Sequence, residues 1–340
     1  MTNKQVLVTG GTGFVGAYLL HYLLQKGYKV KAIKRKTSPM NLVADIQDQV
    51  EWLVGDILDT PFLEQAMKGV QQVYHAAAMI SFHPKDAALM LKINAEGTAN
   101  VVNAALYEKI EKMVHISSIA ALGRKEYQPH IDEKAQWENS KENSNYAISK
   151  FKAECEVWRG MQEGLEIGIV NPSVIIGGGY WAQGSCRLIQ RVAKGLKHYP
   201  QGATGFVDVR DVARAAIELM ESPISGERYI LNGANWSYQQ FFEAVAQALG
   251  QTPPQKKAAA WMVNLLWRLE WFRSKLFRTH PILTKETART SQSTYYYHNE
   301  KIINELNFDF TPIEKTIEDT ALAFKKSQQE GKHFGLVPIR

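Results

Sequence analysis

The sequence predicts an α/β protein, with a doubly wound parallel sheet between two layers of helices and a smaller, mainly helical lobe. Three observations predict this fold class. Short β-rich runs alternate with helical patterns through the first half of the chain. A glycine-rich turn directly follows the first of these runs, and helical patterns dominate from 236 to about 325. Because parallel strands are joined by right-handed crossovers, the alternation favours a doubly wound sheet.

The predicted strands are short and rich in β-branched residues. They are QVLVTG (5–10), KVKAI (29–33), VEWLVG (50–55), VQQVYHAA (70–77), KMVHISS (112–118), EIGIVNP (166–172) and RYILNG (228–233). Helices are predicted between them over 13–27, where Gly27 ends the helical spacing, and over 86–108 and 144–162. A further strand followed by a helix is predicted over 206–222.

The alternation stops after residue 172, which indicates a second structural unit. We therefore predict a sheet domain made of residues 1–172 plus about 206–235. Residues 173–205 plus 236–330 are predicted to form the smaller lobe. Ligands of doubly wound sheets bind at the carboxyl ends of the strands, so we expect this lobe to close over that edge.

The composition is that of an ordinary soluble protein and argues against several function classes. The chain has 340 residues, of which 45% are hydrophobic and 22% are charged. A net charge of +6 permits anionic ligands, but no long basic run or aromatic–basic platform points to nucleic acid. The nine histidines lack metal-ligand spacing, so no metal is predicted. Cys155 and Cys186 are too few for a disulfide scaffold, which favours a reducing, cytoplasmic location.

No stretch of 18 uncharged apolar residues is present, so no membrane-spanning helix is predicted. The opening MTNKQVLVTGGTGF is interpreted as a strand rather than a signal peptide. The segment 258–277 is rich in Trp and Leu at helical spacing, including Trp261, Leu265 and Leu269. We expect this amphipathic helix to pack in the core or to close over a pocket. A membrane surface and a second subunit are the alternatives.

A glycine-rich turn, VTGGTGFVG, joins the first predicted strand to the first predicted helix, with Gly10, Gly13 and Gly16 at three-residue spacing. The first glycine permits a tight turn, the second lets the backbone approach a pyrophosphate, and the third lets the helix pack closely on the strand. Free N–H groups at the helix start favour negative charge. The turn therefore predicts a nucleotide site. Its expected contacts are Gly10, Thr12, Gly13, Phe14 and Val15.

The end of the second predicted strand decides which dinucleotide is expected. An acidic residue there would bind the ribose 2′-hydroxyl of NAD(H), but this chain carries Lys34, Arg35 and Lys36 in KAIKRKTS. A carboxylate would repel a 2′-phosphate, whereas a guanidinium can hold it with paired, charge-assisted hydrogen bonds. We therefore predict NADP(H), with Arg35 as the main anchor and Lys36 or Lys34 assisting. A solvated basic turn is the alternative interpretation.

A tyrosine and a lysine four residues apart, Tyr146 and Lys150 in NYAISK, share one face of a predicted helix. Tyrosine ordinarily ionises near pH ~10, and a neighbouring ammonium favours the phenolate. A hydroxyl is expected beside this pair, at the end of the preceding strand, where Ser117 and Ser118 stand. The alternative is that both serines only bond local backbone.

These motifs resemble the extended short-chain dehydrogenase/reductase family (NAD-dependent epimerase/dehydratase-like), within it the dihydroflavonol-reductase and 3β-hydroxysteroid-dehydrogenase branch. The resemblance covers residues 4–235 well. It is carried by TGGTGFVG, VGDILD (54–59), HAAA (75–78), INAEGTANVVNAA (93–105), HISSIAALG, YAISK and FVDVRDVA. The family implies a catalytic set of Ser118, Tyr146 and Lys150, in which Ser118 is chosen because it stands four residues before Leu122.

The same resemblance implies further cofactor contacts. Asp56 and Ile57 would contact the adenine, and small residues would line the cofactor where bulky ones would block it. The remaining implied contacts are Ala76, Ala77, Ala78, Asn94, Pro172, Ser173 and Ile175. Family members often carry arginine before that proline, where this chain has Asn171.

The resemblance implies hydride transfer between NADP(H) and a carbonyl or alcohol of a small molecule, with Tyr146 moving the proton and Ser118 holding the oxygen. Residues predicted to flank the substrate are Ser81, Phe82, Ile119, Tyr180 and Trp181. A homodimer through helices 86–108 and 144–162 is also implied. A nucleotide-sugar epimerase or dehydratase is the main alternative, because the lobe carries the basic residues Arg187, Arg191, Lys194 and Lys197. A non-catalytic cofactor-binding protein is the third interpretation.

Overall fold

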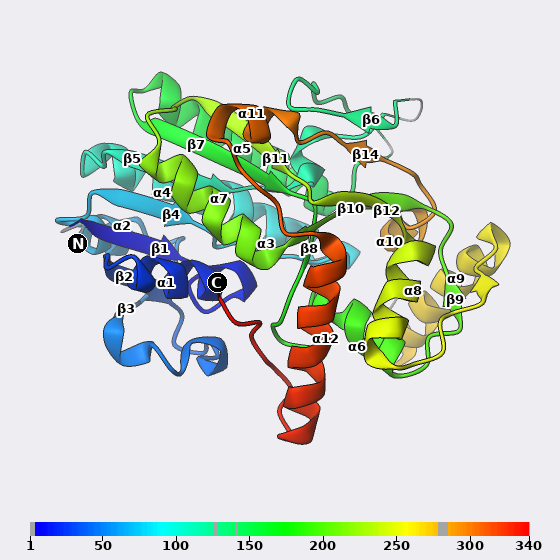
Figure 1. Ribbon diagram of the computed structural model, residues 1–340. Coiled ribbons are helices and arrows are strands. Elements are labelled where there is room, and N and C mark those ends of the chain that lie inside the picture. Colours follow the sequence, from blue (N-terminus) through cyan, green and yellow to red (C-terminus); the bar gives the residue numbers. More distant parts are fainter. Residues whose placement is uncertain (1–3, 126–127, 141, 278–284, 340) are drawn as a thin grey trace.

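The computed structural model describes residues 4–125, 128–140, 142–277 and 285–339. Its centre is a seven-stranded sheet in which every pairing is parallel, in the order β11-β7-β5-β4-β1-β2-β3 (Figure 1). The strand bounds are β1 Gln5–Thr9, β2 Lys29–Lys34, β3 Glu51–Val54, β4 Gln72–His75, β5 Lys112–Ile116, β7 Glu166–Pro172 and β11 Glu227–Leu231. The chain order reverses between β1 and β4, which is where ligands of such sheets bind.

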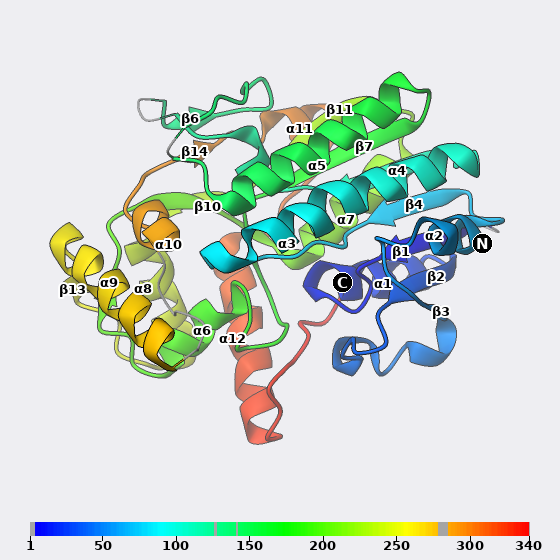
Figure 2. The same ribbon diagram turned by 180° about the vertical axis from the view of Figure 1, so that it is seen from behind.

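Helices cover both faces of this sheet. On the face toward the viewer in Figure 1 lie α1 (Phe14–Gln25) and α7 (Val209–Glu221), whose buried residues share one core with β1 and β2. Figure 2 shows the opposite face, covered by α2 (Thr60–Met67), α4 (Gly97–Tyr107) and α5 (Asn145–Gln162). The predicted doubly wound α/β fold is therefore confirmed.

The predicted helix 86–108 is interrupted. It consists of α3 (Ala87–Leu91), a turn of π-helix (Lys92–Glu96) and α4. Turns of π-helix occur often at functional sites. This turn carries Asn94, one of the predicted contacts.

Most of the remaining elements gather beyond the carboxyl ends of the central strands, whereas α11 (Glu300–Leu306) lies alongside β11. β8 (Val174–Ile176), β10 (Ala203–Asp208) and β12 (Ala234–Ser237) form a second sheet, and Phe206 of β10 and Trp236 of β12 pack with α8 (Tyr238–Leu249). Thus β10, predicted to begin at 206 in the sheet domain, pairs in the smaller sheet instead. Two-stranded pairs join β9 (His198–Tyr199) to β13 (Lys256–Lys257) and β6 (His130–Ile131) to β14 (Tyr296–Tyr297). The other helices are α6 Cys186–Ala193, α8 Tyr238–Leu249, α9 Ala260–Phe277, α10 Lys285–Thr290, α11 Glu300–Leu306 and α12 Ile313–Gln329.

Helix α9 coincides with the predicted amphipathic segment, but its apolar face is not packed in the core. Trp261, Leu265 and Leu269 are 69%, 48% and 57% exposed. The expectation of core packing is therefore wrong for these three side chains. Among the described residues, no helix is both long enough and apolar enough to cross a membrane.

Candidate active site

The glycine turn has the close contacts that its spacing predicts. Gly10 has a φ of 72°, and a Cβ there would lie 2.8 Å from the backbone of Ala77. A Cβ on Gly16 would overlap the carbonyl oxygen of Gly10, so only glycine lets α1 begin so close to β1. Gly13 precedes α1, and no side chain caps the first turn of the helix. Its free N–H groups are therefore available to an anion.

The predicted contacts in this turn follow the same geometry. Thr12 is buried, and Phe14 and Val15 begin α1 with their side chains half-buried. The Phe14 ring packs edge-on against Tyr18, with ring centroids 6.2 Å apart. Tyr18 in turn donates to the carbonyl of Gly178 and accepts from the backbone N–H of Val337. The C-terminal segment is thereby fastened to the first helix.

The basic residues stand directly after β2, one strand away from the turn. Arg35 and Lys36 are exposed, and the backbone N–H of Arg35 donates to the hydroxyl of Ser38 at 3.0 Å. The ammonium of Lys34 lies 5.9 Å from the ring centroid of Trp52. Arg35 therefore has a guanidinium open to solvent beside the predicted adenosine end.

The residues after β3 and β4 lie at the same sheet edge. The backbone N–H of Ala77 donates to the hydroxyl of Thr9 at 3.2 Å, which ties this segment to the end of β1. Ala76 is half-buried and Ala78 is exposed. Asp56 accepts from the N–H of Leu58. The Ile57 side chain is buried against Gly97 of α4, where a Cβ would lie 2.6 Å from its Cδ1, so it packs beneath the site.

Asn94 is completely occupied by protein partners. Its side chain accepts from the N–H of Met79 at 2.7 Å and donates to the Met79 carbonyl and to the Ser149 hydroxyl, both at 2.9 Å. Since Ser149 adjoins Lys150, this amide joins the segment after β4 to α5. The cofactor contact of Asn94 stays a prediction. The hydrogen bonds observed hold the segment after β4 against α5.

Ser118 and Tyr146 lie together at the carboxyl edge. The Ser118 hydroxyl accepts from the N–H of Ala120 at 3.1 Å, which fixes the turn after β5. Ser144 caps α5 by accepting from the N–H of Ala147, and Tyr146 follows in the first turn. Burial raises the pKa of the Tyr146 phenol, and hydrogen bonding with Ser118 opposes that rise. The phenol is therefore protonated at neutral pH.

Lys150 lies one helical turn further along α5 and is only 2% exposed. Its ammonium donates to the carbonyl of Ile116 at 2.9 Å and lies 3.5 Å from Nε2 of His115. Burial lowers the pKa of this amine to about 8, and the carboxylate of Glu154 acts in the opposite direction. The sequence argument expected the ammonium to lower the pKa of Tyr146. In the structure burial dominates and raises that pKa, so this expectation is corrected.

Two histidines form the floor beneath Lys150. The rings of His75 and His115 lie 5.1 Å apart, and both are buried. His75 bonds to the hydroxyls of Thr9 at 2.7 Å and Thr98 at 2.9 Å. Burial, together with the nearby Lys150 ammonium, lowers the pKa of His75 to about 3. Burial and the Lys150 ammonium also lower the pKa of His115, so neutral imidazoles face the lysine.

A buried carboxylate, which the sequence analysis missed, connects the elements of the site. Glu154 is 2% exposed and accepts from the hydroxyl of Ser117 at 2.7 Å and from the amide of Asn171 at 2.9 Å. Arg228 of β11 donates to its other oxygen at 2.9 Å. The Asn171 amide also donates to the carbonyl of Ser118 at 3.0 Å. Glu154 stands four residues after Lys150, on the same helix face, and this spacing is the sequence signal that could have identified it.

Asn171 thus occupies the place where arginine was expected from the resemblance, and it serves the network around Glu154. Next to it, the backbone N–H of Ser173 donates to Leu231 at 2.9 Å. The Ser173 hydroxyl is buried without a hydrogen-bond partner among the described residues. Pro172 ends β7, and Ile175 is half-buried in β8. Ser173 therefore offers an available hydroxyl at this edge.

The predicted substrate residues do not all reach the site. The Phe82 ring lies edge-on to Tyr146, with centroids 5.9 Å apart, and is 38% exposed. The Ser81 hydroxyl donates to Asp86 at 2.6 Å. Ile119 directly follows Ser118 but is buried in a small apolar cluster. Phe82 is thus placed beside the tyrosine.

Tyr180 and Trp181 lie elsewhere. The ring of Tyr180 packs near Phe334 at 6.2 Å between centroids, and backbone groups of Asn41 and Leu42 lower the pKa that burial raises. Trp181 has no exposed surface, and its indole N–H donates to Ser327 at 2.6 Å. A side chain without exposed surface lines no cavity, so Trp181 is corrected to a core residue of the lobe.

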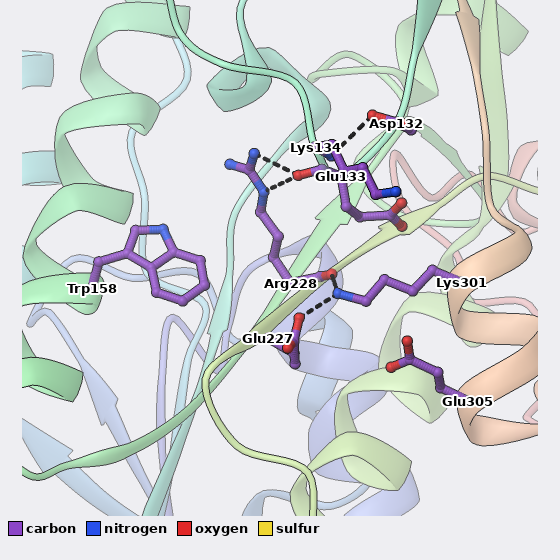
Figure 3. A pocket seen from close by; sticks show the side chains of 8 residues that line it. All are labelled: Asp132, Glu133, Lys134, Trp158, Glu227, Arg228, Lys301 and Glu305. Carbon is purple, nitrogen blue, oxygen red and sulfur yellow. Dashed lines mark hydrogen bonds and ion pairs between the residues drawn. The ribbon is translucent and has the colours of Figure 1, made fainter.

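A surface groove of about 610 Å³ lies behind the network rather than at the tyrosine. Figure 3 shows Arg228 reaching across it toward Glu133, while Lys301 pairs with Glu227. Arg228 donates there to the backbone carbonyls of Glu133 and Ala135, and the Tyr229 phenol donates to Glu305. The Arg228–Glu154 ion pair connects the groove to the site.

Comparison with known proteins agrees with this geometry. A sequence model described as the NAD dependent epimerase/dehydratase family matches residues 6–232. The chain belongs to this family. The extended short-chain dehydrogenase/reductase resemblance is therefore confirmed, with members of that group among its relatives. A protein of Synechocystis sp. provisionally named dihydroflavonol 4-reductase is 32% identical over 94% of each chain. Cinnamoyl-CoA reductase 1 of Petunia hybrida is 26% identical over 98% of this chain and 94% of its own length.

A solved structure shares this architecture over nearly the whole chain. The crystal structure of gox2253 has a TM-score of 0.82 and 30% sequence identity, and it covers 97% of this chain and 99% of its own. The smaller lobe is thus part of the shared fold, although the family model itself ends at residue 232.

We predict that Glu154→Gln lowers the free energy of unfolding by about 3 kcal/mol, because it leaves the Arg228 guanidinium without its buried carboxylate. Chemical denaturation measures the change. Glu163→Gln is the matched control, since Glu163 pairs with Arg159 at the surface and its loss should cost less than about 0.5 kcal/mol. Equal effects of the two substitutions would contradict the buried role of Glu154.

Lys150 gives a prediction for pH. Its pKa is about 8 in the folded chain and ordinarily 10.5, so between these values the unfolded chain binds more protons. The free energy of unfolding of the wild type relative to Lys150→Met should therefore rise as the pH increases from about 8 to 10.5. Below pH 8 the difference should be flat. A difference that is constant or that falls through this window would show that the amine is not desolvated.

Proposed function

We propose that the protein is an NADP(H)-dependent reductase or dehydrogenase that interconverts a carbonyl and an alcohol. The observation that carries the proposal is the meeting of the Tyr146 phenol with Ser118, one helical turn from the buried amine of Lys150. The names of the two reductase relatives support the reaction class. The substrate is a small molecule. A cytoplasmic location and a homodimer through α4 and α5 are part of the proposal.

The residues present fit a dinucleotide. Gly10 and Gly16 form a cradle that a Cβ would fill, and the uncapped start of α1 offers N–H groups to a pyrophosphate. The alanines after β4 have small side chains, which leave room for a cofactor beside the glycine turn. The free hydroxyl of Ser173 lies at the other end of the same edge, where it can bond the nicotinamide half.

NADP(H) is favoured over NAD(H) by charge at the end of β2. Arg35 is exposed and follows β2, where a carboxylate would serve a ribose 2′-hydroxyl. Its guanidinium can bind a 2′-phosphate through paired hydrogen bonds, with Lys36 adding to the local positive potential.

The proton chemistry follows from the two pKa shifts. A phenol whose pKa is raised by burial stays protonated at neutral pH and can give its proton to a carbonyl oxygen. The Ser118 hydroxyl, next to that phenol, can hydrogen-bond the same oxygen as negative charge develops. The Lys150 amine would bind the nicotinamide ribose. When bound, the cofactor supplies the hydride that the carbonyl carbon receives.

A nucleotide-sugar epimerase or dehydratase is the second candidate, and basic residues on α6 favour it. Arg187 and Arg191 lie one turn apart, and burial together with Arg187 lowers the pKa of Arg191. Such a cluster suits a diphosphate. The stoichiometry of NADPH consumption separates the candidates, because an epimerase regenerates its cofactor within each cycle.

Replacing Tyr146 by Phe should reduce kcat by at least about a thousandfold, since the proton donor is removed while the ring remains. NADPH affinity, measured by fluorescence titration, should change less than about threefold. Tyr107→Phe, at a 70% exposed tyrosine, is the control and should keep full activity. Retention of activity by Tyr146→Phe would contradict the assigned acid.

Replacing Arg35 by Ala should weaken the use of NADPH about 10- to 100-fold in kcat/KM, because charge-assisted hydrogen bonds to the phosphate are lost. Use of NADH should change little. Lys29→Ala, at the exposed opposite end of β2, is the control. A similar loss with both cofactors, or a wild type that prefers NADH, would overturn the NADP assignment.

A further inference from the structure

Arg124 stands at the border between the candidate active site and the smaller lobe. It follows Ser118 by six residues, past a short turn of helix (Ile119–Leu122) and Gly123, whose φ is 77°. Its backbone N–H donates to the side chain of Asn143 at 3.0 Å, just before the helix that carries Tyr146. The backbone of Arg124 is thus fixed to the segments that present both the serine and the tyrosine.

The guanidinium of Arg124 lies among tyrosines. It lies 5.1 Å from the ring centroid of Tyr295. Burial lowers the pKa of the guanidinium, but the phenols of Tyr297, Tyr238 and Tyr295 more than offset this and leave it above its ordinary value. The side chain is therefore permanently charged, on the side of the site formed by β14 and the start of α8.

A polar atom in this cluster lacks a partner. The Nε of Arg124 is buried without a hydrogen bond within the described part of the chain, and hydrogen bonding with the Tyr297 phenol is among the interactions that raise the pKa of the guanidinium. Tyr297 is only 1% exposed. Buried donors without acceptors are uncommon in folded proteins, because each costs the free energy of a lost hydrogen bond. The unused donor therefore points to a ligand that accepts.

Two other enclosed arginines, Arg210 and Arg228, are treated differently by this fold. Arg210 pairs with Asp208 and Asp319, and Arg228 pairs with Glu154. No carboxylate forms an ion pair with Arg124 in residues 4–125, 128–140, 142–277 or 285–339. The charge of Arg124 is thus left without the counterion that its neighbours in the fold possess.

We propose that Arg124 binds an anionic group of the substrate, a carboxylate or a phosphate, and thereby selects anionic carbonyl compounds. A guanidinium binds such groups through two parallel hydrogen bonds. The Tyr297 phenol supplies a further donor. The inference rests on the proposed function, since it places the anion beyond the carbonyl that Ser118 and Tyr146 would hold.

The test compares two aldehydes, 4-carboxybenzaldehyde and its methyl ester, as substrates with NADPH; the ester lacks the negative charge and carries one additional methyl group. The wild type should prefer the acid in kcat/KM. Arg124→Gln should lose about tenfold or more with the acid and less than about threefold with the ester, and Arg124→Lys should restore part of the loss. Arg268→Gln, which removes an exposed guanidinium over the Trp267 ring, is the matched control and should preserve the preference. An acid-to-ester ratio unchanged by Arg124→Gln would overturn the proposal.

A second measurement separates failure of this inference from failure of the proposed reaction. If neither aldehyde is reduced, the reaction class is in question and binding decides about Arg124. Calorimetry with benzoate and with inorganic pyrophosphate then compares the full-length wild type and Arg124→Gln. Weaker binding of either probe in the variant supports an anion site, and the probe affected identifies a carboxylate or a phosphate. Equal binding of both probes to both proteins, or binding to neither, overturns it.

Discussion

The carboxylate of Glu154 is the constraint on which the site depends. It is buried on α5 and is bonded at once to β5 through Ser117, to β7 through Asn171 and to β11 through Arg228. A buried charge is costly unless every lone pair is used, so these partners are held in one arrangement. The same helix carries Lys150 one turn earlier. The Glu154–Arg228 ion pair therefore helps to hold the catalytic candidates in position without being one of them.

Desolvation then determines the chemistry that this frame can perform. Burial raises the pKa of the Tyr146 phenol and lowers that of the Lys150 amine to about 8, so the pKa of the amine lies below that of the phenol. The neutral histidines near Lys150 carry no charge that would balance its ammonium, whereas the carboxylate of Glu154 opposes the lowering of the Lys150 pKa. A protonated phenol next to a small hydroxyl suits proton delivery to a carbonyl oxygen, which is the step that the reductase proposal requires.

The fold and the centre of the site could be predicted from the sequence, because both depend on local patterns. Each of the patterns used lies within one turn or one crossover: the glycine spacing, the strand–helix alternation and the four-residue step from Tyr146 to Lys150. What escaped prediction depends on contacts distant in the sequence. Glu154 forms its ion pair with Arg228, which lies on β11, far away in the sequence. Trp181 was assigned to the substrate, although it is buried against Ser327. A local sequence pattern does not show which side chains of a loop are buried by segments distant in the sequence.

The most direct measurement of the central claim is a crystal structure of the protein with NADP⁺ bound. The account predicts the pyrophosphate on the N–H groups that begin α1, the 2′-phosphate against Arg35 and the nicotinamide ring facing the phenol of Tyr146. A nicotinamide ring turned away from that phenol, or a dinucleotide bound elsewhere, would contradict it.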